Sequence, residues 1–215
     1  MHNIPAIQPK NQLDPSAFSE DEKARIRSAI RNKYAAVSSS AAGYFSYTVG
    51  KEGATRLGYP RDILDETPDD LMNSFCGVGN PFSVAPLKEG SIVLDIGCGA
   101  GFDLACASRG TGAAGRVYGV DLSPEMVGKA TANLAAMGII NAEVRLISSE
   151  LLPFPDDTFD TVISNGAINL SPEKPRLFRE IHRVLKQGGR LQFADIILEK
   201  ELPPHLLASV ESWSQ

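Results

Sequence analysis

The sequence of 215 residues is poor in the features that mark several large protein classes. It has only three cysteines, without the close pairs of zinc and redox motifs, so neither a disulfide framework nor a metal site is expected. No run approaches the roughly 18 apolar residues of a membrane-spanning helix, and the amino-terminal stretch lacks the apolar segment of a signal peptide. These absences predict a soluble, cytoplasmic protein with no metal and no membrane partner.

Clustered positive charge is also lacking. The 21 lysine and arginine residues are scattered among 26 aspartate and glutamate residues, and the formal net charge is -5. Proteins that bind nucleic acids usually present a basic face to the phosphates. The charge pattern therefore disfavours a nucleic-acid partner.

What is present is an ordinary globular composition, 43% hydrophobic and 22% charged. The length suits one domain with an extension. We predict an amino-terminal extension with a lid over residues 1–85, a core over 86–200 and a short tail over 201–215.

Within the extension, Ser19 stands three residues before Glu22, which is the spacing of a helix capping box. The apolar residues that follow recur with helical periodicity, so we expect a helix over about 20–37. The next stretch, 41–60, holds four glycines and several aromatic residues. We expect it to form a loop-rich lid.

The core alternates β-branched apolar runs with amphipathic segments. Short apolar runs of this kind are typical of parallel strands that are buried on both faces, and the segments between them are typical of crossover helices. The pattern predicts an α/β fold with a Rossmann-like, doubly wound, mostly parallel sheet. The expected strands cover 92–96, 116–121, 143–147, 160–164 and 190–198. The helix before the last strand is expected to end at Gly188 and Gly189, and its expected inward residues are Leu177, Phe178, Ile181, Val184 and Leu185.

A glycine-rich turn follows the first expected strand. Gly97, Gly99 and Gly101 allow a sharp turn and close approach to a ligand, and the turn leads into a helix whose first N–H groups are free. Asp121 ends the second expected strand, where a carboxylate is placed to accept the hydroxyls of a ribose. The pair predicts a ligand that contains a ribose, such as an adenosine.

Two details narrow the ligand further. A dinucleotide-binding loop would have its third glycine at the position of Phe102, whereas here it is Gly101. Asp95, inside the strand, suits the ammonium group of a sulfonium amino acid. The two details favour S-adenosylmethionine and disfavour a nicotinamide-dependent oxidoreductase.

These segments together resemble the class I methyltransferase superfamily. The similar stretches are 95–101, 121–126, 152–160 and 183–191, so the resemblance covers roughly residues 86–200. It implies S-adenosyl-L-methionine as the cofactor and methyl transfer as the activity. The residues that it implies in cofactor binding are Asp95, Gly97, Cys98, Gly99, Gly101, Asp121, Leu122, Met126, Ser148, Ser149 and Asn165. Among them, Ser148 and Ser149 would contact the adenine edge, Leu122 and Met126 would flank the ring, and Asn165 would lie beside the methionine portion.

No catalytic dyad is visible, and none is required, because methyl transfer from a sulfonium chiefly needs a positioned acceptor and the exclusion of water. No catalytic residue is therefore assigned, and His182 is expected on a helix surface. The aromatic residues Tyr34, Tyr44, Phe45 and Tyr47 either cover the site, facing the sulfonium, or pack the extension against the sheet.

The stretches 79–81 and 163–175 resemble more closely the arsenite methyltransferase family. In that family, arsenic-binding cysteines fall at the positions of Val78 and Gly166, and both are missing here. We therefore expect methyl transfer to a different small molecule. Arsenite methylation and non-catalytic binding of an S-adenosyl ligand remain the alternatives.

The superfamily usually adds two strands after the fifth, but only 17 residues follow Leu198. We therefore expect the last strands of the usual seven to be absent. An exposed sheet edge invites pairing, so a homodimer is a further expectation.

Overall fold

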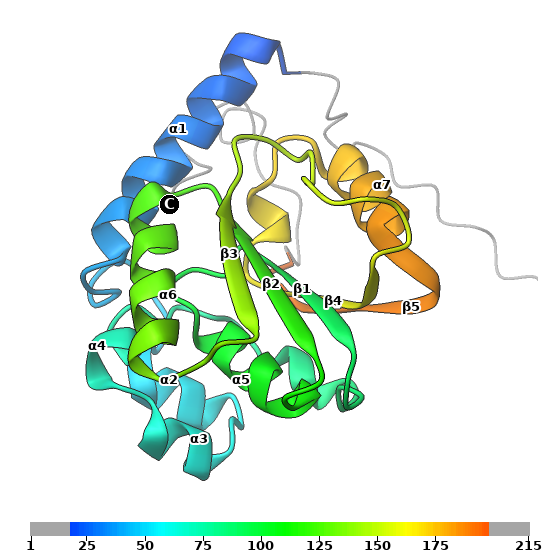
Figure 1. Cartoon of the computed structure of the whole chain (residues 1–215). Coiled ribbons are helices and arrows are strands. Elements are labelled where there is room, and N and C mark those ends of the chain that lie inside the picture. Colours follow the sequence, from blue (N-terminus) through cyan, green and yellow to red (C-terminus); the bar gives the residue numbers. More distant parts are fainter. Residues whose placement is uncertain (1–17, 198–215) are drawn as a thin grey trace, which may run out of the picture.

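The computed structural model describes residues 18–197, so residues 1–17 of the predicted extension and the predicted tail over 201–215 lie outside this range. Its sheet has five strands in the order β3-β2-β1-β4-β5, and every neighbouring pair is parallel (Figure 1). The predicted Rossmann-like sheet is thereby confirmed. The strands are β1 (Ile92–Ile96), β2 (Arg116–Asp121), β3 (Ala142–Leu146), β4 (Phe159–Asn165) and β5 (Leu185–Ala194).

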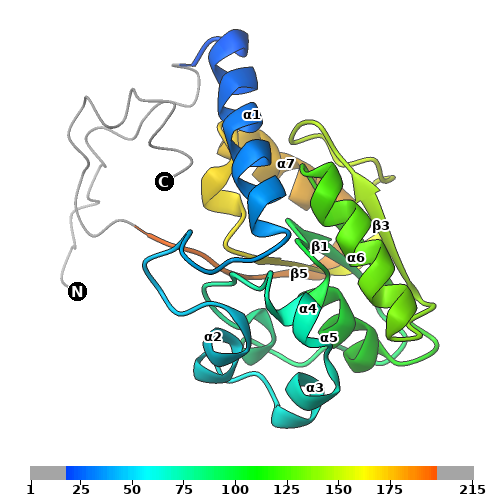
Figure 2. The same cartoon turned by 90° about the vertical axis from the view of Figure 1, so that its left-hand side faces the viewer.

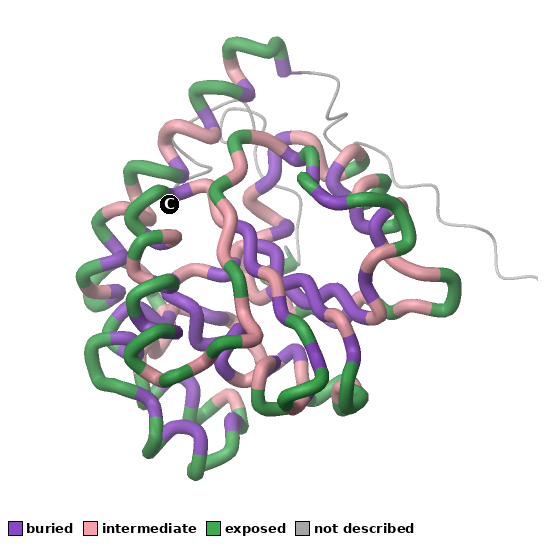
Figure 3. The backbone as a smooth tube through the Cα atoms, viewed as in Figure 1, coloured by how far each residue is buried: buried purple, intermediate pink, exposed green. Residues whose placement is uncertain are grey.

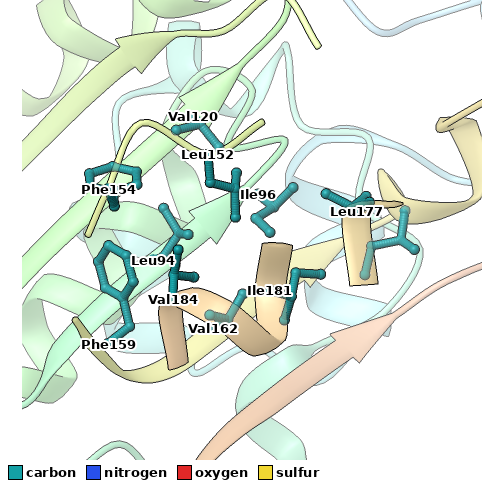
Figure 4. Packing of buried hydrophobic residues seen from close by; sticks show 11 residues of the cluster. Leu94, Ile96, Val120, Leu152, Phe154, Phe159, Val162, Leu177, Ile181 and Val184 are labelled. Carbon is teal, nitrogen blue, oxygen red and sulfur yellow. The ribbon is translucent and has the colours of Figure 1, made fainter. Parts of the chain in front are cut away.

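Helices cover both faces of this sheet. Helices α5 (Phe102–Thr111) and α6 (Pro124–Ala136) pack on one face, and α7 (Lys174–Val184) packs on the other (Figures 1 and 2). Successive side chains of a strand point to opposite faces. In β1, Val93 therefore packs with α5 and α6, while Leu94 packs with α7 (Figure 4). The central strands are accordingly buried along most of their length (Figure 3).

The strand order creates a crevice above the middle of the sheet. From β1 the chain passes to β2 on one side, and later enters β4 on the other side of β1. In open α/β sheets ligands bind at such a switch point, outside the carboxyl ends of the strands. The fold therefore places a ligand site where β1 and β4 end.

The amino-terminal helix α1 (Glu20–Val37) has the predicted bounds and the predicted capping box. The backbone N–H of Glu22 donates to Ser19 Oγ at 3.3 Å, and the N–H of Ser19 donates to the Glu22 carboxylate at 2.8 Å. Further along the helix, Arg27 forms ion pairs with Glu150 and Glu173. These pairs tie α1 to the segment after β3 and to the start of α7. α1 is thus held over the carboxyl edge of the sheet (Figure 2).

The lid segment 41–60 is less irregular than predicted, because it contains helix α2 (Gly50–Arg56). Helices α3 (Arg61–Glu66) and α4 (Asp69–Met72) follow. Buried side chains of the three helices pack in one apolar cluster with Phe102 of α5. Tertiary packing therefore stabilises helices that are too short to be stable on their own. Two short 3-10 helices, Pro81–Ser83 and Ile168–Leu170, complete the described elements.

The junction of α7 and β5 corrects two predictions. Gly188 and Gly189 do not end the helix, since β5 already begins at Leu185 and pairs with Phe159 before a register shift. Phe178, predicted to point inward, is 41% exposed and packs edge-on against Phe193 at 6.5 Å between ring centroids. The inward face of α7 is narrower than expected and is formed by Leu177, Ile181 and Val184.

None of the helices within residues 18–197 is both long and apolar enough to cross a bilayer.

Candidate functional site

A cleft opens at the carboxyl ends of the strands. It encloses about 880 Å³ of empty space, its mouth included, and most of its wall is apolar. A smaller cavity of about 390 Å³ adjoins it and shares Cys76, Gly97, Gly99 and Asn165 with it. The larger volume is within the range of small-molecule sites.

The loop between β1 and α5 forms one wall of both spaces. Gly97 and Gly99 have positive φ angles of 74° and 51°, a region that other residues rarely adopt. A Cβ at Gly97 would clash with the Cβ of Ala167, whereas nothing lies within 4 Å of a Cβ at Gly99. The loop is fixed to the end of β2, because the N–H of Gly97 donates to the carbonyl of Val120 at 2.8 Å. A ligand can therefore approach the loop backbone closely at Gly99.

Asp121, at the end of β2, lines the cleft beside this loop. Its Oδ2 accepts from the N–H of Gly99 and its Oδ1 from the N–H of Ser123, both at 2.9 Å. Burial raises the pKa of Asp121, and these hydrogen bonds oppose the rise. The two contacts hold the carboxylate rigidly at the wall of the cleft, as ribose recognition requires.

Asp95 of β1 is 2% exposed, and its Oδ2 has no hydrogen-bond partner. Burial raises its pKa well above the usual range, and the neighbouring carboxyls of Asp103 and Asp121 add to the shift. A buried carboxylate without a partner is costly, so the position fits a cationic ligand group. Asp95 is not among the residues that line the cleft or the smaller cavity, and its role as the anion near the ammonium group stays a prediction.

Apart from Asp95, the predicted cofactor residues divide into those that line the cleft and those that do not. Those lining the cleft are Gly97, Gly99, Asp121, Leu122, Met126, Ser149 and Asn165. Ser148 is exposed and does not line it. The Cys98 backbone borders the smaller cavity, but its thiol faces the sheet, where a Cβ at Gly119 would lie 2.8 Å from Sγ. Gly101 faces α6, since a Cβ there would lie 3.3 Å from that of Ala130.

The four predicted lid residues differ in whether they reach the cleft. Tyr34 lines the cleft, and burial raises its pKa, so its hydroxyl stays protonated. Phe45 packs between Tyr34 and Tyr47, at centroid distances of 6.4 and 5.2 Å. Tyr47 donates to the carbonyl of Cys76 at 2.9 Å, and Tyr44 is 46% exposed. Tyr34 therefore reaches the cleft, and Phe45 and Tyr47 support it from behind.

Sequence reasoning missed two parts of the wall. The first is a face of α1 with Ile30 and Arg31, and the second is the stretch 166–172 after β4. The helical periodicity of Ile26, Ile30 and Tyr34 was a signal for the first. No local pattern showed that this face would cover the cleft.

The three cysteines of the sequence do not meet. Cys76 borders both spaces, and burial raises its pKa to about 12, so the thiol is neutral. Cys106 lies on α5, packed against the cluster formed with α2, α3 and α4. His182 is exposed on α7, as predicted. Within the described range, no three histidine, cysteine or carboxylate side chains are grouped to hold a metal ion.

A parallel sheet with a glycine loop and an acid at the end of its second strand defines the class of Rossmann-like nucleotide-binding domains. The family model of the methyltransferase domain matches residues 87–215. The chain belongs to this family, and the predicted relationship is confirmed.

Three relatives illustrate the relationship. An arsenite methyltransferase of Halobacterium salinarum is 36% identical over 191 residues, covering 82% of this chain and 49% of that protein. A ubiquinone/menaquinone biosynthesis C-methyltransferase of Escherichia fergusonii is 39% identical over 142 residues, 60% of this chain and 56% of that protein. An arsenic(III) S-adenosylmethionine methyltransferase from Chlamydomonas reinhardtii, known from a crystal structure, is 31% identical in sequence and has a TM-score of 0.55. The match covers 78% of this chain and 57% of that chain. The chain spans about half the length of the curated relatives it matches.

Proposed function

We propose that the cleft binds S-adenosyl-L-methionine and that the chain transfers its methyl group to a small-molecule acceptor. The observation that carries the proposal is the pairing of Asp121 with the N–H of Gly99 at the cleft wall. This carboxylate would accept the ribose hydroxyls, and the unpartnered oxygen of Asp95 would face the ammonium group.

The remaining cofactor contacts are proposed from the same wall. Leu122 and Met126 would flank the adenine ring, and Ser149 would contact its edge, with Ser148 beside it. Gly97, Cys98, Gly99 and Gly101 would shape the loop around the methionine portion. Membership of the methyltransferase domain family and the likeness to an S-adenosylmethionine methyltransferase support this arrangement.

When bound, S-adenosylmethionine supplies an activated methyl group on a sulfonium. The chain's own contribution is to place an acceptor atom against that methyl and to exclude water. The apolar wall, covered by α1 and Tyr34, suits this task. Since the Tyr34 hydroxyl and the Cys76 thiol both stay protonated, neither is a ready base, and no catalytic residue is assigned.

Binding of S-adenosylhomocysteine tests the cofactor assignment. At a ligand concentration of 100 times Kd we expect a stabilisation of about 2.7 kcal/mol, which raises the melting temperature of a chain of this length by roughly 5–10 °C. Nicotinamide dinucleotides serve as the control and should have no effect. A shift with the dinucleotide alone would refute the proposal, and binding without methyl release over a broad acceptor panel would favour a non-catalytic role.

The acceptor is proposed to be a small molecule other than arsenite. A side chain at Gly166 would lie 3.4 Å from a methyl group of Val78, so the two positions that carry cysteines in the arsenite enzymes are neighbours here. Both lack thiols, and Cys76 is the single cysteine that lines the cleft. Arsenic(III) is a soft centre that thiolates bind, and a single neutral thiol would bind it weakly.

The expected homodimer stays a prediction.

Replacing both residues, V78C with G166C, should create an arsenite site next to Cys76. Because linked ligands raise the effective concentration of each other, we expect As(III) affinity to rise by roughly 100-fold over the natural chain. Calorimetry with arsenite under reducing conditions measures the gain, with V78S and G166S as the matched control. Tight As(III) binding by the unaltered chain would restore arsenite as the proposed acceptor.

A further inference from the structure

A polar network adjoins the smaller cavity. The Tyr59 hydroxyl donates to Asp103 Oδ1 at 2.6 Å, and the Asn165 amide donates to Asp103 Oδ2 at 3.0 Å. Tyr59 lies between α2 and α3, Asp103 in the first turn of α5, and Asn165 at the end of β4. Three distant parts of the sequence thus converge on one carboxylate, which is 7% exposed.

Asn165 is fully engaged within the protein. Its Oδ1 accepts from the N–H groups of Val78 and Gly79 at 2.8 and 3.1 Å, and its Nδ2 donates to the Gly79 carbonyl at 2.9 Å as well as to Asp103. Asn165 was predicted to lie beside the methionine portion of the cofactor. Its hydrogen bonds show that it braces Asp103 and the segment before the first 3-10 helix.

Asp103 is the one charged side chain among the described residues that line the smaller cavity. This cavity joins the larger cleft along the backbone of Gly97 and Gly99. A ligand with its adenosyl group in the cleft would therefore send its amino-acid tail past the loop toward Asp103.

The carboxyl groups at this end of the site favour the binding of a cation. Burial raises the pKa of Asp103 to about 6, and the hydrogen bonds from Tyr59 and Asn165 oppose the rise, so the carboxylate is charged at neutral pH. Asp103 in turn raises the pKa of Asp95, whose Oδ2 is buried without a partner. Two neighbouring buried carboxylates repel each other, and a cation that meets both offsets the repulsion.

We propose that Asp103, held in place by Tyr59 and Asn165, is the second anion that binds the ammonium group of the cofactor, beside Asp95. This inference rests on the proposed function. It makes Asp103 a binding residue that selects ligands with a charged amino-acid tail, and Tyr59 and Asn165 its positioning residues.

The test compares two ligands in calorimetry at pH 7.5. S-adenosylhomocysteine carries the ammonium group, and 5′-methylthioadenosine keeps the adenosine but lacks the tail. Because a hydrogen bond to a charged group is strong, Asp103→Asn should weaken S-adenosylhomocysteine binding about tenfold or more and leave 5′-methylthioadenosine binding within about twofold. The matched control is Asp62→Asn, which removes an exposed carboxylate that pairs with Arg109.

An equal loss for both ligands would show that Asp103 is only structural, and no loss for either would also overturn the inference. If the natural chain bound neither ligand, the proposed function itself would fall. Tyr59→Phe, which keeps the charge and the ring, should cost S-adenosylhomocysteine less affinity than Asp103→Asn.

The natural chain offers a second readout should Asp103→Asn not fold. The groups facing Asp103 are the Tyr59 hydroxyl, the Asn165 amide, the Asp95 carboxyl and the Cys106 thiol, and burial keeps the tyrosine and the cysteine neutral. The preference for S-adenosylhomocysteine over 5′-methylthioadenosine should therefore fall as the pH drops through about 6, where Asp103 gains its proton. A preference that stays constant from pH 8 to 5 would contradict the inference.

Discussion

Gly97→Ala is expected to lower the free energy of unfolding by about 2–5 kcal/mol. The left-handed backbone at this position costs an alanine about 1–2 kcal/mol, and overpacking adds about 1–3 kcal/mol. The second contribution arises because the new methyl group would clash with the Cβ of Ala167, at the point where the first loop meets the end of β4. Urea unfolding followed by circular dichroism measures the loss.

Gly99→Ala is the matched control for this prediction. Gly99 also has a positive φ angle, but open space surrounds the position of the added methyl group. Only the backbone strain of about 1–2 kcal/mol should remain. If the two variants lost the same stability, the contact between Gly97 and Ala167 would not be a determinant of the fold.

Asp121→Ala is expected to weaken S-adenosylhomocysteine binding about 100-fold. The estimate assumes two ribose hydroxyls that each donate to the carboxylate, with about 1.5 kcal/mol lost for each hydrogen bond to a charged group. The variant also releases the N–H of Gly99, which the carboxylate now holds at 2.9 Å. Titration calorimetry gives the affinity directly.

Two controls separate ribose recognition from a general effect on the fold. Asp121→Asn keeps the shape and one acceptor oxygen, so its loss should be intermediate. Asp69→Ala removes an exposed carboxylate of α4 and should leave the affinity unchanged. An unaltered affinity in Asp121→Ala would show that the ribose does not bind at the end of β2.

Local sequence patterns predicted the structure correctly where a single helix, strand or turn carries the whole signal. The capping box predicted α1 with its observed bounds, and the apolar run of β1 predicted a strand buried on both faces. The glycine spacing predicted a sharp turn, and in the structure Gly97, Gly99 and Gly101 have positive φ angles. These features depend on neighbours within a few residues, which the sequence displays directly.

Local patterns failed where packing between elements decided the outcome. Helix α2 was predicted as loop because seven residues carry little signal of their own. Phe178 has the helical spacing of an inward residue, yet it lies on the outer side of α7 beside Phe193. The side of α1 that covers the cleft depends on ion pairs to Glu150 and Glu173, which lie more than 100 residues away in the chain.

Strand alternation and turn chemistry are local properties, so the amino-acid sequence is enough to predict the parallel sheet, the glycine turn, an acid inside β1 and an acid at the end of β2. Only the tertiary structure brought Asn165 to Tyr59 and Asp103, and only it left an oxygen of Asp95 without a partner. Burial and charge depend on what surrounds a group in space. The linear sequence does not show which groups become buried neighbours. That is decided when the sheet, α1 and the segment before β1 pack together.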